Sequence, residues 1–177
     1  QQIWEIQSER SELERELYLQ ALHKTASMSL IQYEVSNFAK ADFQSRSNLK
    51  VWDGQPYLGL GCGAHSFDGV NRWGNVRSMR KYMESVGREE PPRDFMETPT
   101  RLQQASERLM LSLRRPEGLN ILSWQEEFQI GLSLEQKNQM EKLKDQDLVS
   151  WESPILKLTT EGMLLADAIT AELMPEA

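Results

Sequence analysis

The residues best placed to do chemistry lie in one glycine-rich run, residues 57–66, with the sequence Tyr-Leu-Gly-Leu-Gly-Cys-Gly-Ala-His-Ser. Within this glycine motif, Cys62 and His65 are close enough in sequence for an imidazole to activate a thiolate or to share a metal ion with it. Either kind of site needs a further partner, and none lies within reach in the sequence. We therefore predict that Cys62 is a small packed residue.

The motif alternates glycine with other residues, at Gly59, Gly61 and Gly63. Such glycines indicate that the backbone approaches another group closely. That group is either a cofactor or another part of the chain, in which case the glycines mark a structural bend. A phosphate cradle is a third alternative, although the spacing differs from GxGxxG and no Lys follows directly.

The elements before the motif predict an α/β arrangement. Leu13 and Leu17 belong to an apolar stripe at helical spacing, which predicts an amphipathic helix over residues 8–24. A short buried strand is predicted over residues 30–35, followed by a loop over residues 36–48. A helix and a strand are half of a repeating α/β unit, and such folds place their chemistry at the carboxyl ends of strands.

After the motif, residues 67–70 contain an Asp-Gly pair that predicts a tight hairpin. Ser78 is expected to cap a short helix that ends at Gly87. Residues 88–97 contain two adjacent prolines and many charges, which is typical of a linker. We place a domain boundary there.

The carboxy-terminal residues 98–177 predict a mainly helical domain. Thr98, followed by proline, is expected to cap a helix that stops before Pro116. Ser123 and Ser133 each begin a capping-box pattern, so two further short helices should follow.

Two strands are predicted over residues 148–151 and 155–158, and Thr159 or Thr160 should cap a last helix. Three helices, a two-stranded wing and a closing helix make a winged-helix module. Its recognition helix would be residues 133–146, where three acidic residues balance three lysines. Helices that read a DNA groove are typically basic, so the sequence does not favour DNA binding.

Composition narrows the class of protein. The net charge is −7, and there are 12 basic against 14 acidic residues up to residue 97 and 8 against 13 beyond it. Neither part has the basic excess of a nucleic-acid surface. The single cysteine excludes an internal disulfide and any iron-sulfur site built from several thiolates of this chain, and it fits a reducing, cytoplasmic location.

No apolar run approaches the length of a membrane span. The first five residues contain neither Met nor the pattern of a signal peptide, so we expect the chain to begin inside a longer protein.

Four motifs occur in order along the chain: residues 33–40 (Tyr-Glu-Val-Ser-Asn-Phe-Ala-Lys), Trp52 with the glycine motif, residues 73–77 (Trp-Gly-Asn-Val-Arg), and residues 111–114 with Glu117-Gly118. In this order and spacing they resemble radical S-adenosylmethionine proteins of the oxygen-independent coproporphyrinogen oxidase and HemW heme-chaperone group. The resemblance covers nearly all of the chain beyond Ser8.

This resemblance implies an α/β fold that is the end of a partial barrel (residues 1–87), a linker (88–97) and a winged-helix-like domain (98–177). In the group, three cysteines of a CxxxCxxC segment hold a [4Fe-4S] cluster that cleaves S-adenosylmethionine to a radical. This chain begins after that segment, so it cannot start the chemistry alone and supplies neither catalytic residues nor metal ligands.

The resemblance also implies which residues contact S-adenosylmethionine: Gly61, Gly63, Ala64, His65, Leu49 and Lys50. The His65 imidazole would stack on the adenosine portion or form a hydrogen bond with it. The alternative is a buried histidine whose ring is bonded to backbone carbonyls.

One departure concerns heme. HemW-type chaperones often carry an HNxxY motif proposed to ligate heme, and here Ser47–Val51 occupy its place, without the imidazole and the phenol. The resemblance implies a HemW-type heme chaperone, with heme or a porphyrinogen and a heme-receiving protein as partners. The alternatives are an oxygen-independent coproporphyrinogen III oxidase and a non-catalytic winged-helix binding module.

Overall fold

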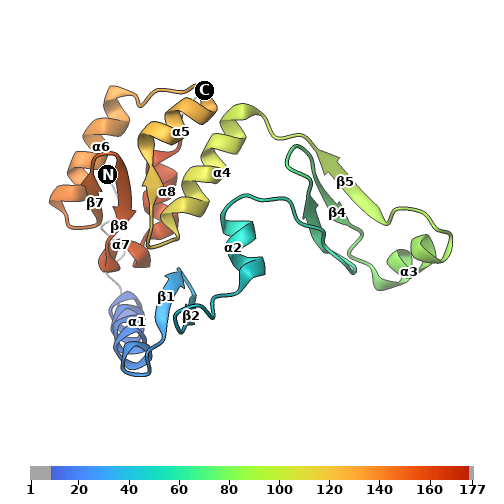
Figure 1. Cartoon of the computed structure of the whole chain (residues 1–177), viewed down its shortest axis with the longest axis horizontal. Helices are drawn as coiled ribbons and strands as arrows, with labels where there is room; N and C mark the ends of the chain where they lie inside the picture. Colours follow the sequence, from blue (N-terminus) through green and yellow to red (C-terminus); the bar gives the residue numbers. More distant parts are fainter. Residues whose placement is uncertain (1–8, 176–177) are drawn as a thin grey trace.

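The structure is a computed structural model and describes residues 9–175. The expected helix start at Ser8 and the outer ends of the two predicted domains lie outside these residues. Figure 1 shows a body of packed helices and strands, with an arm that projects away from it. We call residues 101–173 the body and residues 57–97 the arm.

The body contains eight elements, α4 (Arg101–Leu113), β6 (Leu119–Asn120), α5 (Ile121–Phe128), α6 (Leu134–Asp145), β7 (Val149–Glu152), β8 (Ile155–Leu158), α7 (Thr160–Leu164) and α8 (Ala166–Leu173). Its core is apolar, and the side chains of Leu113, Leu143 and Ile169 are fully inaccessible to solvent. Burial of each such side chain contributes roughly 1.5–3 kcal/mol to folding. The body therefore has a core of its own.

Capping residues set where the helices of the body begin. Thr100 starts α4, because its hydroxyl accepts from the Gln103 N–H while the Gln103 side chain accepts from the Thr100 N–H. The cap predicted at Thr98 is therefore wrong by two residues. Ser133 and Gln136 form the same reciprocal pair at the start of α6, as predicted.

The body's sheet has the strand order β6-β8-β7. The two predicted strands of the wing are confirmed as the β7–β8 hairpin, but β6 adds a third strand that the sequence did not indicate. β6 is only two residues long, and its second residue, Asn120, also caps α5 by accepting from the Ser123 N–H at 3.0 Å. The cap predicted at Ser123 is therefore wrong. The winged-helix assignment itself stays a prediction.

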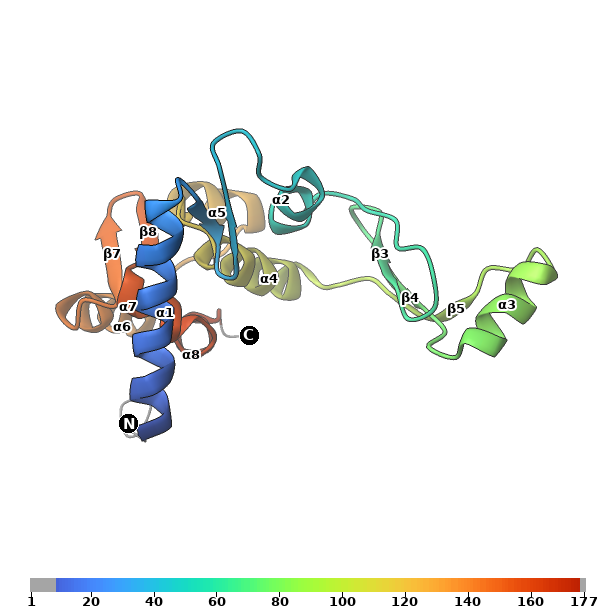
Figure 2. The ribbon, with the colours of Figure 1, turned by 90° about the horizontal axis from the view of Figure 1, so that it is seen from below.

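Before the arm lie α1 (Glu9–Ser27), β1 (Ile31–Glu34), β2 (Asn37–Ala39) and α2 (Arg46–Trp52). The predicted helix and strand are confirmed as α1 and β1. The predicted loop is wrong in part, because β2 pairs antiparallel with β1 and α2 follows. Figure 2 shows α1 lying across the body near α7, where Arg15 Nε donates to Glu161 Oε2 at 2.8 Å.

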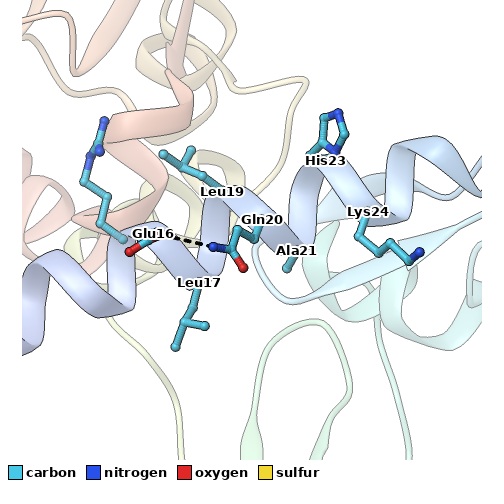
Figure 3. A pocket seen from close by; sticks show the side chains of 8 residues that line it. Glu16, Leu17, Leu19, Gln20, Ala21, His23 and Lys24 are labelled. Atoms are coloured by element: carbon cyan, nitrogen blue, oxygen red, sulfur yellow. Dashed lines mark hydrogen bonds between the residues drawn. The ribbon is translucent and has the colours of Figure 1, made fainter.

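The side of α1 that packs is not the predicted apolar stripe. Tyr18 packs against the body's core, whereas Leu13 and Leu17 are 56% and 55% exposed. In Figure 3, Leu17 and Leu19 point to opposite sides of the helix, and Gln20 donates to Glu16 along its surface at 3.1 Å. An apolar stripe of α1 is thus left uncovered by the described residues.

The arm contains β3 (His65–Phe67), β4 (Arg72–Asn75), α3 (Met79–Gly87) and β5 (Arg93–Glu97), and its sheet has the order β3-β4-β5. The predicted hairpin is confirmed by the antiparallel pairing of β3 with β4, and Ser78 caps α3 as predicted. The predicted linker is wrong in part, because its second half forms β5 and pairs with β4. Its prolines precede the strand, where they interrupt no ladder bond.

Candidate cofactor-binding site

Three polar side chains hold the glycine motif in place. The buried Ser66 hydroxyl accepts a hydrogen bond from the Gly59 N–H at 2.9 Å. The Tyr82 hydroxyl accepts one from the Gly61 N–H at 3.1 Å, and the Asn75 amide donates to the Gly61 carbonyl at 2.9 Å. Because these bonds satisfy backbone groups on alternate residues, they fix the path of the motif beside the arm's sheet and α3.

The alternating glycines have different physical roles. A Cβ atom on Gly59 would lie 2.0 Å from the His65 carbonyl oxygen, so this glycine permits close packing of the chain on itself. Gly61 has φ +105°, and no atom lies within 4 Å of where its Cβ would be. Gly63 has φ +69°, and a Cβ atom there would lie 3.7 Å from Cγ of Arg77. The structural interpretation is confirmed for Gly59. At Gly61 the space beside the Cα is open, although its N–H and carbonyl are already bonded to Tyr82 and Asn75.

His65 begins β3 and its side chain is exposed. Its ring meets the Phe95 ring edge-on, with centroids 5.5 Å apart and an interplanar angle of 63°. The interpretation of His65 as a buried histidine is therefore wrong for the described residues. An exposed imidazole next to the open space beside Gly61 can stack on a ligand or bond to it. Cys62 is half-buried with a free thiol.

A small hollow lies beside the motif. Its volume is about 200 Å³, and its lining includes Leu58, Leu60, Trp73 and Tyr82. The Arg93 guanidinium lies 5.0 Å from the centre of the Trp73 ring and closes one part of the wall. None of the six residues predicted to contact a cofactor is among those that line this hollow.

The six predicted residues fall into two groups. Gly61, Gly63, Ala64 and His65 share one turn of the motif, in which the Ala64 N–H donates to the Gly61 carbonyl at 3.4 Å. The other group, Leu49 and Lys50, lies on α2, whose first turn is capped by the neighbouring Ser45. Among the described residues, no hydrogen bond joins the two groups. Their shared role in binding stays a prediction.

The hairpin turn after β3 is held by Asp68. Its carboxylate accepts from the N–H groups of Asn71 at 2.6 Å and Val70 at 2.8 Å. These backbone hydrogen bonds favour the charged form and lower the pKa of Asp68 below its usual range. The turn thereby fixes how β3 and β4 meet, and with them the position of Ser66 and Asn75.

Sequence reasoning missed several residues that shape this region. Ser66 and Asn75 lie inside or next to quoted motifs, but their role depends on contacts across the hairpin. Glu34 is a buried carboxylate, 1% exposed, at the end of β1, and it accepts from the Ser36 N–H at 3.0 Å. Asp53, after α2, meets side chains more than fifty residues away, which no local pattern could reveal.

No protein-family model matches the sequence. The chain is 30% identical to heme chaperone HemW of Bacillus subtilis over 93% of this chain and 44% of that protein. It is 31% identical to heme chaperone HemW of Mycobacterium tuberculosis, over 80% of this chain and 34% of that protein. The chain belongs to the HemW-like group of radical S-adenosylmethionine proteins. It spans less than half the length of these HemW relatives.

A solved structure supports the fold of the HemW-like chain. Coproporphyrinogen III oxidase (HemN) from Escherichia coli, described as a radical SAM enzyme, matches 94% of this chain with a TM-score of 0.72 and 16% identity. The match covers 42% of the oxidase chain. The mixed α/β fold predicted from the sequence is therefore confirmed.

The chain's own residues fit two of the group's cofactors differently. An iron-sulfur cluster needs several thiolates, and Cys62 is the chain's single cysteine, so the residues present do not fit the cluster. Within residues 9–175, no three His, Cys, Asp or Glu side chains are grouped to hold a metal ion. S-adenosylmethionine needs no metal ligand from this chain, and the open space beside Gly61, next to the exposed His65, fits a contact with it.

Heme does not fit at the place where the HemW-like group carries its HNxxY motif. Ser47 and Asn48 lie on α2 with Leu49, and none of these side chains is an iron ligand that heme proteins use. Among the described residues, no helix is both long enough and apolar enough to cross a membrane.

Proposed function

We propose that this chain is the carboxy-terminal part of a HemW-type radical S-adenosylmethionine protein that handles heme. The observation that carries the proposal is the match to heme chaperones from two distant bacteria over most of this chain. The remaining length of those relatives would supply the cluster and the rest of the barrel. The uncovered Leu13 and Leu17 of α1 support this, because apolar side chains at helical spacing usually pack against further structure.

In this proposal the chain presents one wall of the S-adenosylmethionine site. When bound to a reduced cluster, S-adenosylmethionine supplies a carbon radical. The residues of this chain do not take part in that cleavage. The exposed imidazole of His65 binds and orients the adenosine portion next to the open space beside Gly61, together with Leu49 and Lys50 on α2.

We place the domain boundary at the end of the predicted linker, after β5, and the protein in the reducing cytoplasm, which suits its single free thiol. Heme would be bound by groups outside α2, because residues 47–51 contain no His, Cys, Met or Tyr, the side chains that usually hold heme iron. A heme-receiving protein is the partner that such a chaperone requires.

The test uses the longer protein with its cluster reconstituted without oxygen. We expect a shift of the heme Soret band that saturates at stoichiometric heme, and no decarboxylation of coproporphyrinogen III. Absence of heme binding with turnover of coproporphyrinogen would contradict the proposal and favour the oxidase, the class of the matched solved structure.

The chain's two histidines provide a matched pair of variants for the cofactor contact. His65→Gln should weaken S-adenosylmethionine binding about fivefold, the effect of losing one hydrogen bond of roughly 1 kcal/mol. His23→Gln, which changes an exposed histidine on α1, should leave the Kd unchanged. Equal Kd values for His65→Gln and the unmodified protein would contradict a contact at His65.

A further inference from the structure

Two arginines of the carboxy-terminal part bind Asp53, the residue that follows α2. The Asp53 carbonyl accepts a hydrogen bond from Arg108 Nη1 at 2.7 Å, and the Asp53 carboxylate pairs with Arg115 Nη1. Arg108 lies on α4, and Arg115 lies just beyond the end of that helix. In Figures 1 and 2, α2 lies next to α4, between the body and the arm.

The environment makes these contacts stronger than ordinary surface pairs. The Arg115 side chain is 19% exposed and the Arg108 side chain 30% exposed, while the Asp53 side chain is 42% exposed, so the pair is partly buried on the arginine side. Charge-assisted bonds in partly buried settings are stronger than neutral ones and are less screened by salt. Glu117 Oε2 lies 3.2 Å from Arg115 Nε and adds a second anion beside the same guanidinium.

Apolar packing gives α2 only a weak anchor. The helix has seven residues, of which none is buried and Leu49 and Trp52 are half-buried. A helix this short has little stability of its own in water. Polar contacts at its ends therefore help to decide where it lies, and the contacts at Asp53 reach the body.

A separate observation at the next residue supports the same contact. Gly54 has φ +65°, and a Cβ atom there would lie 3.2 Å from Arg108 Nη2. A side chain at position 54 would thus be strained by the backbone and would crowd the guanidinium. Both the backbone conformation of Gly54 and its lack of a side chain leave room for the Arg108 guanidinium at the end of α2.

We propose that Asp53 is a positioning residue through which Arg108 and Arg115 set the place of α2. On the proposed function, α2 carries Leu49 and Lys50 to the S-adenosylmethionine site. The carboxy-terminal part would then determine the position of α2, which forms one wall of that site, in addition to covering the barrel. Asp53 itself does not contact the cofactor.

Neighbouring arginines give a matched test of this proposal. Arg114 and Arg115 are adjacent, but Arg114 pairs with Asp167 on α8, inside the body, rather than with Asp53. Hydrogen exchange of backbone amides is measured by mass spectrometry on this chain, in Arg115→Gln, in Arg114→Gln and in the unmodified protein. We expect Arg115→Gln to speed exchange over residues 46–57 about tenfold, the loss of one strong charge-assisted contact.

Arg114→Gln should leave exchange over residues 46–57 unchanged. Arg115→Lys, which keeps a positive charge next to Asp53, should retain part of the protection, which a general loss of the side chain's packing would not do. Unchanged exchange in Arg115→Gln, or an equal increase in Arg114→Gln, would overturn the proposal. Because the measurement needs neither cofactor nor heme, its outcome is independent of whether the proposed function holds.

Discussion

The body and the arm are held together by different interactions. Of the 19 buried apolar side chains among the described residues, 17 lie in the body and none lies in the arm. The arm instead relies on strand pairing, on the polar tethers of the glycine motif, and on Arg72, which pairs with Glu97 at 2.7 Å and with Glu107 on α4 at 2.8 Å. The region with the strongest core carries none of the six predicted binding residues. The arm and α2, which have few buried apolar side chains, carry all six.

This difference fits the division of labour that we propose. A region with its own core resists change, whereas a wall of a binding site must be completed by other structure and can be adjusted. The arm and α2 expose backbone and side chains that only a cofactor or further chain would cover. The comparison leads to predictions in which similar changes have unequal effects in the two regions.

The largest expected effect is a cavity in the body. Leu143→Ala removes a fully buried side chain and should lower the free energy of unfolding by about 2–5 kcal/mol. Leu60→Ala, in the arm, changes a side chain that is 81% exposed and should alter it by less than about 0.5 kcal/mol. Urea denaturation followed by circular dichroism measures both. Similar losses for the two variants would contradict a core confined to the body.

A side chain that clashes at a glycine should lower the stability of the whole fold if the glycine lies in the body. In the arm, the same clash should disturb only the neighbouring residues. A Cβ atom would lie 1.9 Å from the Leu148 carbonyl oxygen at Gly162 and 2.0 Å from the His65 carbonyl oxygen at Gly59. Gly162→Ala should therefore lower the midpoint of thermal unfolding, because α7 packs on the core. Gly59→Ala should speed amide exchange over residues 57–67 and leave the midpoint nearly unchanged.

Gly131→Ala is the control for both glycine variants. No atom lies within 4 Å of where its Cβ would be, so neither readout should change. A lower midpoint in Gly59→Ala of the same size as in Gly162→Ala would mean that the arm and the body unfold as one unit.

The smallest expected effect concerns pH and the contact between α1 and the body. The hydrogen bond from Arg15 holds the pKa of Glu161 below its usual value of 4.5. A lowered folded pKa means that this contact stabilises the protein above pH 4.5, and that the contribution disappears as the pH falls through the folded pKa. The pair is exposed, so the effect should be small and weakened by salt.

An NMR titration of the Glu161 carboxyl measures this pKa directly. Its midpoint should lie below the usual glutamate value of 4.5. In Arg15→Gln the midpoint should rise toward that value. A midpoint for Glu161 that does not move in this variant would show that Arg15 is not the cause.

The sequence predicted the elements that depend on local patterns. Helical spacing, the capping box at Ser133 and the Asp-Gly turn each lead to the observed α1, α6 and β3–β4 hairpin. Those signals lie within a few residues of the element that they form, so one sequence suffices to find them. The family and the fold class also followed from motifs that are continuous in the sequence.

The errors share a different physical origin. β5 and β6 are strands because of partners elsewhere in the chain, whereas β2 pairs with the adjacent β1. The sequences of these strands contain Asn, charged residues or only two positions, so none of them reads as a strand alone. The sequence leaves two interpretations of His65 open, because the exposure of this side chain depends on the whole arm. The contacts of Asp53 with Arg108 and Arg115 span 55 and 62 residues, so only a folded structure reveals them.

The central claim is that the body is a stable unit on which the less stable site-bearing regions are positioned. Native-state hydrogen exchange of this chain in low urea concentrations tests it most directly. We predict that amides of α4, α6 and α8 exchange only through global unfolding, while those of α2 and the β3–β4 hairpin exchange through smaller openings. Equal opening free energies in all of these elements would contradict the account.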